Sequence, residues 1–314
     1  MSNINILLCT FRRTHVDATI RSLAEQTNLP GSIHLVVADN DDTPSAEARI
    51  SEVAKEVDFP ITYVHAPARN ISIARNACLD AADPDADWIA LLDDDEIAPP
   101  NWLAQLHSRA CETEADGVFG YVKAIYDNTT PQWMVDLDIH STIPLPRGGK
   151  VQTGSTGNAL LRWAGTSWQG ERFELARGKS GGEDTEFFFR LNRLGACFVI
   201  APDAILLEQV PPSRLSTEWL LNRRFRMGQS YVSGAVTRGT RVSLLASAAV
   251  KSLYCILRGA VSLKQDQRMY WRLRCALHRG ICSGVLGAGQ AELYGNHAEL
   301  ALPAKRSREK SHTN

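Results

Sequence analysis

The sequence predicts an α/β fold in which helices cover both faces of a mostly parallel sheet. Three observations support this prediction. Short apolar runs of strand length alternate with segments of helical periodicity through residues 1–112, polar or acidic residues follow several of these runs, and 44% of the chain is hydrophobic, enough for a sizeable core. Such alternation is typical of parallel sheets, because each parallel strand needs a crossover connection.

The first four strands are expected where apolar runs end in polar turns, at residues 4–10, 33–38, 61–64 and 88–92. Helices are expected where apolar residues recur at helical spacing, at residues 16–26, 46–57, 72–82 and 101–112. Ser72 is the expected N-cap of the third helix. Each strand is thus followed by a helix.

The pattern changes after about residue 116. Further strands are expected at residues 118–126, 158–162 and 197–200, and helices at residues 183–194, 216–226 and 242–263. Residues 128–149 are rich in Pro and Gly and are expected to contain loops. We therefore expect a sheet-based domain over residues 1–229, a helical appendage over residues 230–304 and a basic, disordered tail over residues 305–314.

Charge is unevenly distributed although the net charge is only −1. From Leu220 to the end, 16 Lys and Arg accompany 4 Asp and Glu, so the preceding part is acidic. A split of this kind indicates a basic surface that faces an anionic partner, either nucleic acid or a membrane.

The seven cysteines are an odd number, and no two form a C-x-x-C pair. This argues against a disulfide framework or a zinc ribbon and favours a reducing cytosol. No secretory signal is expected, because the first residues lack a basic segment before an apolar one. The longest apolar stretches, residues 242–250 and 252–257, end at Lys251 and Arg258, short of the roughly 20 residues that cross a bilayer.

Two acidic clusters follow predicted strands. Asp93, Asp94 and Asp95 come directly after residues 88–92, and Asp39 follows residues 33–38. Ligands of open α/β sheets bind outside the carboxyl ends of the strands, and packed carboxylates repel unless a cation neutralises them. A divalent cation is the natural candidate, since it prefers oxygen ligands. The alternatives are a solvated acidic turn for the first cluster and helix capping for the second.

Two predicted helix starts also carry polar groups. Arg75 lies near the start of the third helix, where positive charge opposes the helix dipole unless an anion binds there; the alternative is an ion pair with Asp80 or another carboxylate. Glu183 and Asp184 follow two glycines at a later helix start. A carboxylate there suits a general base, and the alternative is N-capping.

Taken in order, these motifs resemble those of inverting glycosyltransferases of family two, which have the GT-A fold. The resemblance extends from Asn5 to about Gln229. It rests on the runs C-T-F-R-R at residues 9–13, V-A-D-N at 37–40, S-I-A-R-N at 72–76, L-D-D-D at 92–95, T-G-S-T-G-N-A-L-L at 153–161 and G-E-D at 182–184.

The resemblance implies a role for each matching residue. Asp184 would be the catalytic base, and Asp93 and Asp95 would hold Mg²⁺ or Mn²⁺. The nucleotide-sugar site would comprise Thr10, Arg12, Asp39, Arg75, Asp93 and Asp94. The acceptor site would comprise Asn158, Glu183, Arg223 and Arg224.

A narrower resemblance, to enzymes of bacterial succinoglycan assembly, rests on residues 70–76, 178–185, 223–226 and 292–295. It implies transfer of glucose from UDP-glucose, with a β-linked product, to a lipid-linked oligosaccharide at the cytoplasmic face of the plasma membrane. The Q-x-x-R-W motif of processive relatives is not found, and residues 222–226 stand roughly in its place. This favours addition of a single sugar.

Alternatives to this function are a sugar-nucleotide nucleotidyltransferase and a non-catalytic carbohydrate- or nucleic-acid-binding protein. The glycine-rich, lysine-containing loop of the former is missing at residues 9–13, and the carboxyl-terminal aromatic residues form no recognisable base-stacking platform, so no nucleic-acid partner is expected. Residues 242–263 and 281–289 form a basic, partly apolar surface that suits peripheral contact with anionic lipid. The alternative is a helical subdomain packed on the core.

Overall fold

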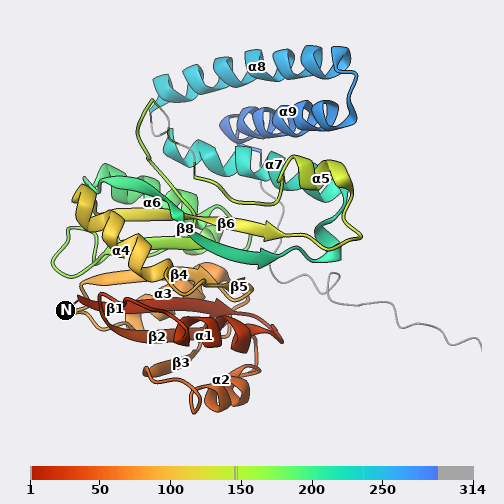
Figure 1. The fold of residues 1–314 in the computed structure, drawn as a ribbon. Coiled ribbons are helices and arrows are strands. Elements are labelled where there is room, and N and C mark those ends of the chain that lie inside the picture. Colours follow the sequence, from red (N-terminus) through yellow and green to blue (C-terminus); the bar gives the residue numbers. More distant parts are fainter. Residues whose placement is uncertain (1, 145, 147, 236, 289–314) are drawn as a thin grey trace, which may run out of the picture.

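The computed structural model describes residues 2–144, 146, 148–235 and 237–288. Within them, eight strands form one sheet in the order β3-β2-β1-β4-β7-β6-β8-β5 (Figure 1). The strands are β1 (Ser2–Thr10), β2 (Gly31–Asp39), β3 (Ile61–His65), β4 (Trp88–Asp93), β5 (Glu96–Ile97), β6 (Gly117–Ile125), β7 (Asn158–Arg162) and β8 (Phe198–Gln209).

Strands β3, β2, β1 and β4 are parallel to one another. In their register Thr10 lies opposite Asp39, and Cys9 lies opposite Asp93. The carboxyl ends of β1, β2 and β4 therefore meet at one edge. The two acidic clusters therefore follow strands that end at the same edge of the sheet, on either side of β1.

The other half of the sheet is mixed. Strand β7 is antiparallel to both β4 and β6, β8 is parallel to β6, and β5 is antiparallel to β8. Four of the seven strand pairs are parallel, as the prediction of a mostly parallel sheet requires. Strand β8 continues nine residues beyond the expected end at residue 200, and the two-residue β5 was not expected.

Helices cover both faces of the sheet, as predicted. On one face, α1 (Val16–Ala24), α2 (Glu47–Val53) and α4 (Trp102–Thr113) pack against alternate residues of the strands, such as Ile6 and Leu8. On the other face, α3 (Ile71–Ala81) and α6 (Glu183–Arg193) pack against the residues between them, such as Leu7. Each strand thus contributes to two apolar layers.

The start of α3 differs from the prediction. Asn70 is its N-cap, and Asn70 Oδ1 accepts hydrogen bonds from the backbone N–H groups of Ser72 and Ile73 at 3.1 and 3.3 Å. The prediction that Ser72 caps the helix was wrong, because the Ser72 hydroxyl instead donates to the Glu174 carbonyl at 2.9 Å. The expected loop at residues 128–149 also contains a short helix, α5 (Gln132–Asp136).

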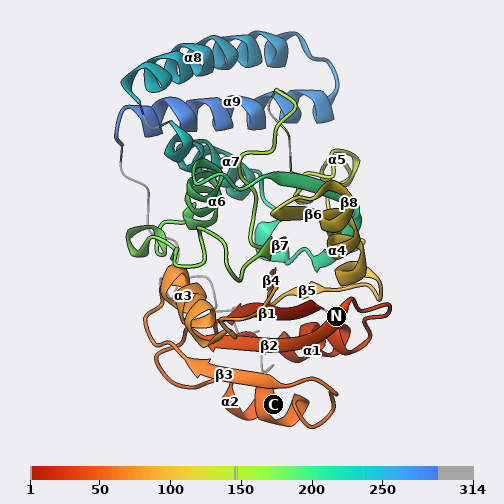
Figure 2. The same ribbon diagram turned by 90° about the vertical axis from the view of Figure 1, so that its left-hand side faces the viewer.

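The carboxyl-terminal part consists of α7 (Thr217–Tyr231), α8 (Arg238–Val261) and α9 (Gln265–Val285). In both views α9 lies between α7 and α8, and α8 is outermost (Figures 1 and 2). Gly280 lets α9 approach α7 closely, since a Cβ there would collide with the Phe225 carbonyl. Helix α9 was not expected. The predicted tail at residues 305–314 and the motif at residues 292–295 lie outside the described residues.

Helix α8 is long and apolar enough to cross a membrane by length and composition, with a mean hydropathy of 1.5 over its most apolar window. The expectation that no apolar stretch reaches that length was therefore wrong, because Lys251 and Arg258 interrupt the run without ending the helix. In the structure α8 lies along α9 and buries Ala248 and Cys255. Most of its surface stays exposed.

Candidate active site

The acidic run after β4 forms the floor of the site. Asp94 points inward, where its Oδ2 accepts a hydrogen bond from Thr10 Oγ1 at 2.7 Å and its carbonyl accepts one from Thr19 at 3.1 Å. Asp95 faces Arg13, whose guanidinium donates to its Oδ2 at 3.0 Å. The Asp93 side chain is 51% exposed. Asp94 thus fastens the turn to β1 and α1, while Asp93 is accessible from outside.

Crowding makes the negative charge of this run unfavourable. Desolvation and the carboxylates of Asp95 and Glu208 raise the pKa of Asp93, against the lowering effect of Arg75, to about 6. Desolvation and Asp95 likewise raise the pKa of Asp94 to about 7, against the lowering effect of Arg13. An additional cation at this position would stabilise the ionised carboxylates.

Arg75 joins this floor to the start of α6. Its side chain is buried, its Nη1 donates to Glu183 Oε1, and its Nη2 lies 3.8 Å from Asp93 Oδ1. The alternative that Arg75 pairs with a carboxylate is thus confirmed, although the partner is Glu183 and not Asp80, which Arg172 contacts at 2.8 Å. The second predicted helix start is thereby held against the first acidic cluster.

Asp184 lies beside this ion pair, in the first turn of α6. Its Oδ1 accepts from the backbone N–H and hydroxyl of Thr185 at 2.6 and 3.2 Å. No group within the described ranges hydrogen-bonds its Oδ2. Desolvation and the neighbouring Glu183 raise the pKa of Asp184 to about 6, against the lowering effect of Arg75. Its charge also acts on Asp93, so the two carboxylates share one electrostatic environment.

Two buried polar atoms near this junction lack a partner among the residues that the structure describes: Thr156 Oγ1 and Glu183 Oε2. Thr156 lines a small cavity together with Cys9, Arg75 and Asp93. Buried polar atoms are usually hydrogen-bonded. Their lack of partners here is consistent with a site that a polar ligand completes.

The predicted nucleotide residues of β2 are buried beneath the site. Asp39 is fully buried, and its carboxylate accepts hydrogen bonds from the backbone N–H groups of Asp41 and Ala46 and from the Tyr63 hydroxyl, at 2.8 to 3.1 Å. Arg12 forms an ion pair with Asp41 at 2.8 Å. Asp39 therefore holds the loop that connects β2 to α2, and Arg12 lies over that loop.

The predicted acceptor residues are not gathered in one place. The Asn158 amide lies inside the sheet, where its Oδ1 accepts from the Trp102 indole and its Nδ2 donates to the carbonyls of Tyr121 and Ala204, each at 2.9 Å. On α7, Arg224 donates to the Ile139 carbonyl at 3.2 Å. Arg223 lies 5.2 Å above the Trp219 ring. Among the four predicted acceptor residues, Glu183 forms an ion pair with Arg75.

Several charged residues without a predicted role lie near Asp93 and Asp95. Arg214 lies 3.6 Å from Asp95 and also pairs with Glu208, while the buried Glu96 accepts from the Asp93 backbone N–H at 2.7 Å. Pairing of β5 with β8 sets Glu96 opposite Glu208. Arg13 stands within a quoted motif, but nothing in the sequence points to Glu208 and Arg214, because Glu208 lies in the unexpected extension of β8 and Arg214 follows it.

The carboxylates of the acidic run could hold a divalent cation only together with ligands from outside the protein. Within the described part of the chain, no group of three or more His, Cys, Asp or Glu is arranged to hold a metal ion. Mg²⁺ in phosphate-transfer sites often takes only one or two carboxylates and completes its shell with substrate oxygens and water. Asp93 and Asp95 fit that arrangement, since both are oxygen donors and the Asp93 side chain is 51% exposed.

Comparison with known proteins identifies the family. The model for glycosyl transferase family 2 matches residues 6–164, and that for glycosyl transferase family group 2 matches residues 88–278. The chain belongs to glycosyl transferase family 2. It is similar to the succinoglycan biosynthesis protein ExoM of Rhizobium meliloti (strain 1021), with 42% identity over 299 residues, 93% of this chain and 96% of ExoM. The chain is thus a glycosyltransferase, and the alternative functional classes are excluded.

Solved glycosyltransferases share this fold. The mannosyltransferase PcManGT from Pyrobaculum calidifontis, in complex with GDP-Man and Mn²⁺, has a TM-score of 0.64 at 13% identity and covers 91% of this chain and 88% of its own. TarS 1-349 of S. aureus has a TM-score of 0.52 at 13% identity, covering 91% and 92%. The predicted GT-A fold with a helical carboxyl-terminal part is confirmed.

Proposed function

We propose that this family 2 glycosyltransferase is a metal-dependent, inverting enzyme that transfers a single glucose from UDP-glucose, in β-linkage, to a lipid-linked oligosaccharide. The observation that carries the proposal is the junction at which Arg75 joins Asp93 to the start of α6, beside Asp184. ExoM supports the exopolysaccharide pathway by its name, and a further TarS structure, in complex with UDP-GlcNAc (TM-score 0.51), supports a UDP-sugar donor.

The donor would bind over the edge where β1, β2 and β4 end. Asp93 and Asp95 would hold Mg²⁺ or Mn²⁺, as the Mn²⁺ in PcManGT suggests, and the ion would stabilise negative charge on the departing diphosphate. Arg75 would lie near that diphosphate. Thr10 and Asp94 would support the nucleotide pocket by fixing the turn.

The nucleotide base would lie over the loop after β2. Asp39 would act on it indirectly, because its carboxylate already holds the backbone of that loop. Arg12, whose side chain is partly exposed over the same loop, would line the pocket.

The acceptor hydroxyl would approach Asp184. Its Oδ2 would take the hydroxyl proton as the oxygen attacks the anomeric carbon from the face opposite the leaving group. A single displacement of this kind inverts the configuration, so an α-linked donor gives a β-linked product. Glu183 would keep Asp184 in place through its ion pair with Arg75.

The other predicted acceptor residues differ in whether their polar groups are free to contact an acceptor. We propose positioning roles for Asn158 and Arg224, because backbone carbonyls and an indole N–H occupy their polar groups. Arg223, which lies over the Trp219 ring, stays a candidate acceptor contact. We also propose that the chain divides into a catalytic domain of residues 1–229 and a helical appendage of residues 230–304.

The enzyme would work at the cytoplasmic face of the bacterial plasma membrane as a peripheral protein. The outer face of α8 is apolar and accessible, with Val250, Leu253 and Val261 exposed by 69, 59 and 71%. Residues 237–288 carry nine Lys and Arg but only one acidic residue, Asp266. An apolar face with a basic surround suits anionic lipid. Peripheral contact is favoured over spanning, because the other face of α8 packs on α9.

A donor and metal screen tests this function. The enzyme is incubated with UDP-glucose, other UDP-sugars and GDP-sugars, with and without EDTA, and the linkage of the product is read by NMR. We expect turnover of UDP-glucose to a β-linked product, loss of turnover in EDTA, and recovery with Mn²⁺ or Mg²⁺. Full activity in the chelator would refute the metal role, and an α-linked product would refute inversion.

A further inference from the structure

The run at residues 70–76 contains two asparagines, Asn70 and Asn76, to which the proposed function gives no role. Asn70 is the N-cap of α3, and Asn76 follows Arg75 in the same helix. Both side chains contact the backbone of residues 173–178. This segment leads into α6, so the two asparagines join the helix that carries Arg75 to the segment that precedes the proposed base.

Asn76 holds the beginning of the segment by two hydrogen bonds to one residue. Its Oδ1 accepts from the Phe173 backbone N–H at 2.7 Å, and its Nδ2 donates to the Phe173 carbonyl at 3.0 Å. Phe173 is buried, and its ring stacks on the ring of Phe187 in α6, with the centroids 4.1 Å apart. Asn76 therefore ties α3 to a residue that packs directly against α6.

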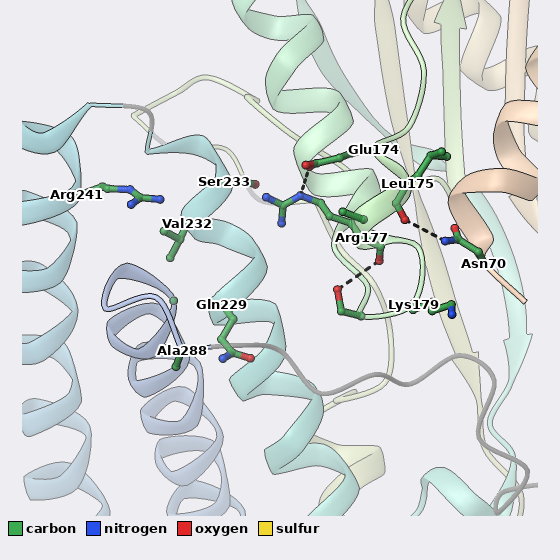
Figure 3. A pocket seen from close by; sticks show the side chains of 13 residues that line it. Asn70, Glu174, Leu175, Arg177, Lys179, Gln229, Val232, Ser233, Arg241 and Ala288 are labelled. Atoms are coloured by element: carbon green, nitrogen blue, oxygen red, sulfur yellow. Dashed lines mark hydrogen bonds and ion pairs between the residues drawn. The ribbon is translucent and has the colours of Figure 1, made fainter.

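Asn70 holds the middle of the segment. Besides capping α3 with its Oδ1, it donates from Nδ2 to the Leu175 carbonyl at 3.0 Å (Figure 3). Gly178 lies so close that a Cβ at this residue would collide with Asn70 Oδ1, and the Gly178 carbonyl accepts from the Ile71 backbone N–H at 3.1 Å. One side chain thus both begins α3 and fixes the approach to α6.

The opposite side of the segment borders open space. A cavity of about 590 Å³ lies between residues 174–180 and the carboxyl-terminal helices, which line it with residues such as Gln229 (Figure 3). Leu175 is 53% exposed. From α7, Arg226 Nη2 donates to the Ser180 carbonyl at 3.1 Å. Because close packing covers mainly one side, we expect the hydrogen bonds to α3 to contribute strongly to the position of the segment.

The backbone between this segment and α6 adopts glycine conformations. Gly181 and Gly182 both have a φ of +84°, and Gly182 is the N-cap of α6. Glycine has more backbone conformations available than other residues. The direction in which α6 begins is therefore not determined by the local backbone alone and depends on the contacts that hold the chain before it.

We infer that Asn70 and Asn76 are positioning residues for Asp184. By fixing residues 173–178 against α3, they set the place at which α6 begins relative to Arg75. The inference rests on the proposed function, in which Asp184 is the base. A misplacement of about 1 Å can lower the rate of an enzyme by about 10²-fold, so a small shift of α6 would be enough to reduce turnover.

Substitutions that keep the cap of α3 test the role of Asn70. Serine and aspartate cap helices about as well as asparagine, but the first is too short to reach the Leu175 carbonyl and the second cannot donate to it. We expect Asn70→Ser and Asn70→Asp each to lower kcat by at least about tenfold. The UDP dissociation constant should change by less than about twofold, and the midpoint of thermal unfolding should stay near that of wild type. Normal kcat in both variants would leave Asn70 as a helix cap only and overturn its positioning role.

Asn76→Ala tests the second residue, with Asn5→Ala as its matched control. Asn5 Oδ1 accepts from the Asp83 backbone N–H at 3.0 Å, just beyond the other end of α3. Both variants therefore remove side-chain contacts that hold the same helix. We expect Asn76→Ala to lower kcat by at least about tenfold and Asn5→Ala to change it by less than about twofold. The same kcat in the two variants would attribute any loss to general loosening of α3 and overturn the role of Asn76.

Hydrogen exchange measures the position of the segment without turnover. In Asn70→Ser and Asn76→Ala the backbone amides of residues 173–186 should exchange at least about tenfold faster than in wild type, and in Asn5→Ala they should not. Unchanged exchange in the first two variants would overturn the inference, whichever residue is the base. Normal turnover by Asp184→Asn would instead sink the proposed base and leave the exchange result unaffected.

Discussion

Asp93, Asp95 and Asp184 can lie near one another because positively charged arginine side chains lie between and around them. Arg75 lies between Asp93 and Glu183, and Arg13 and Arg214 both contact Asp95. A guanidinium is always charged and donates in a plane, so each arginine can hold two carboxylates at once. In the proposed function, these arginines would exchange carboxylate partners for phosphate oxygens of the donor.

The pKa of Asp184 predicts how the rate depends on pH. Desolvation and the neighbouring Glu183 raise the pKa of Asp184, Arg75 on α3 and the hydrogen bonds from Thr185 lower it, and the result is a pKa of about 6 instead of the usual value near 4. Only the ionised form can accept a proton. We therefore expect kcat to rise with pH through about 6 and, well below it, to fall about tenfold per pH unit.

The control for this profile is UDP affinity over the same pH range, which separates base titration from loss of donor. A kcat that stays flat from pH 4.5 to 7.5 while UDP remains bound would contradict the assignment of Asp184 as base.

Asn158 is expected to matter for stability. Asn158→Ala would leave the Trp102 indole N–H and the carbonyls of Tyr121 and Ala204 without partners inside the sheet. The predicted loss is about 2–4 kcal/mol of unfolding free energy, measured by denaturant titration. The matched control is Asn101→Ala, because the exposed Asn101 side chain caps nothing, and it should change stability by less than about 0.5 kcal/mol. Equal stability of the two variants, with a raised KM for acceptor in Asn158→Ala, would restore the acceptor role.

At the scale of helices and strands, the sequence predicts best where periodicity is uninterrupted. Strand β4 is a buried apolar run that ends in acids, and its position and the direction of its carboxyl end follow directly. Strand β8 was expected to be short, because Pro202 and Asp203 break the apolar run and the partly buried edge beyond them looks polar. In α9 the buried Met269, Leu273 and Ile281 are separated by arginines, which hides the helical repeat.

The exposed apolar face of α8 is predicted to contact anionic lipid. Leu253→Ser/Leu257→Ser should reduce binding to anionic vesicles by about tenfold or more, because it removes apolar area that lipid would cover, while the fold persists because both side chains are mostly exposed. The matched control is Leu29→Ser/Leu194→Ser, which removes two exposed leucines of the sheet-based domain. Equal vesicle binding by wild type and the α8 variant would argue that this face does not contact lipid.

At the scale of the whole molecule, the fold brings distant segments to one edge of the sheet. The acidic floor follows β4, its arginine comes from α3 and the proposed base from α6. This grouping could be predicted because each residue follows a recognisable strand or lies near the start of a helix. The positions of Arg214 and Glu208 could not be predicted. Arg214 lies near Asp95, and Glu208 acts on Asp93, because β5 pairs with β8.

The whole arrangement also explains why a single base should control turnover but not donor affinity. In the proposed function, Asp184 serves the acceptor, and the carboxyl ends of β1, β2 and β4 serve the donor. Loss of its charge removes proton acceptance, and the groups assigned to UDP and the cation stay in place.

The most direct measurement is therefore the kcat and the UDP dissociation constant of Asp184→Asn, alongside Asp80→Asn, whose carboxylate only pairs with Arg172 at the surface. We expect Asp184→Asn to bind UDP within about twofold of wild type and to lose about 10²–10⁴ in kcat, with Asp80→Asn near normal. Normal turnover by Asp184→Asn would contradict the account.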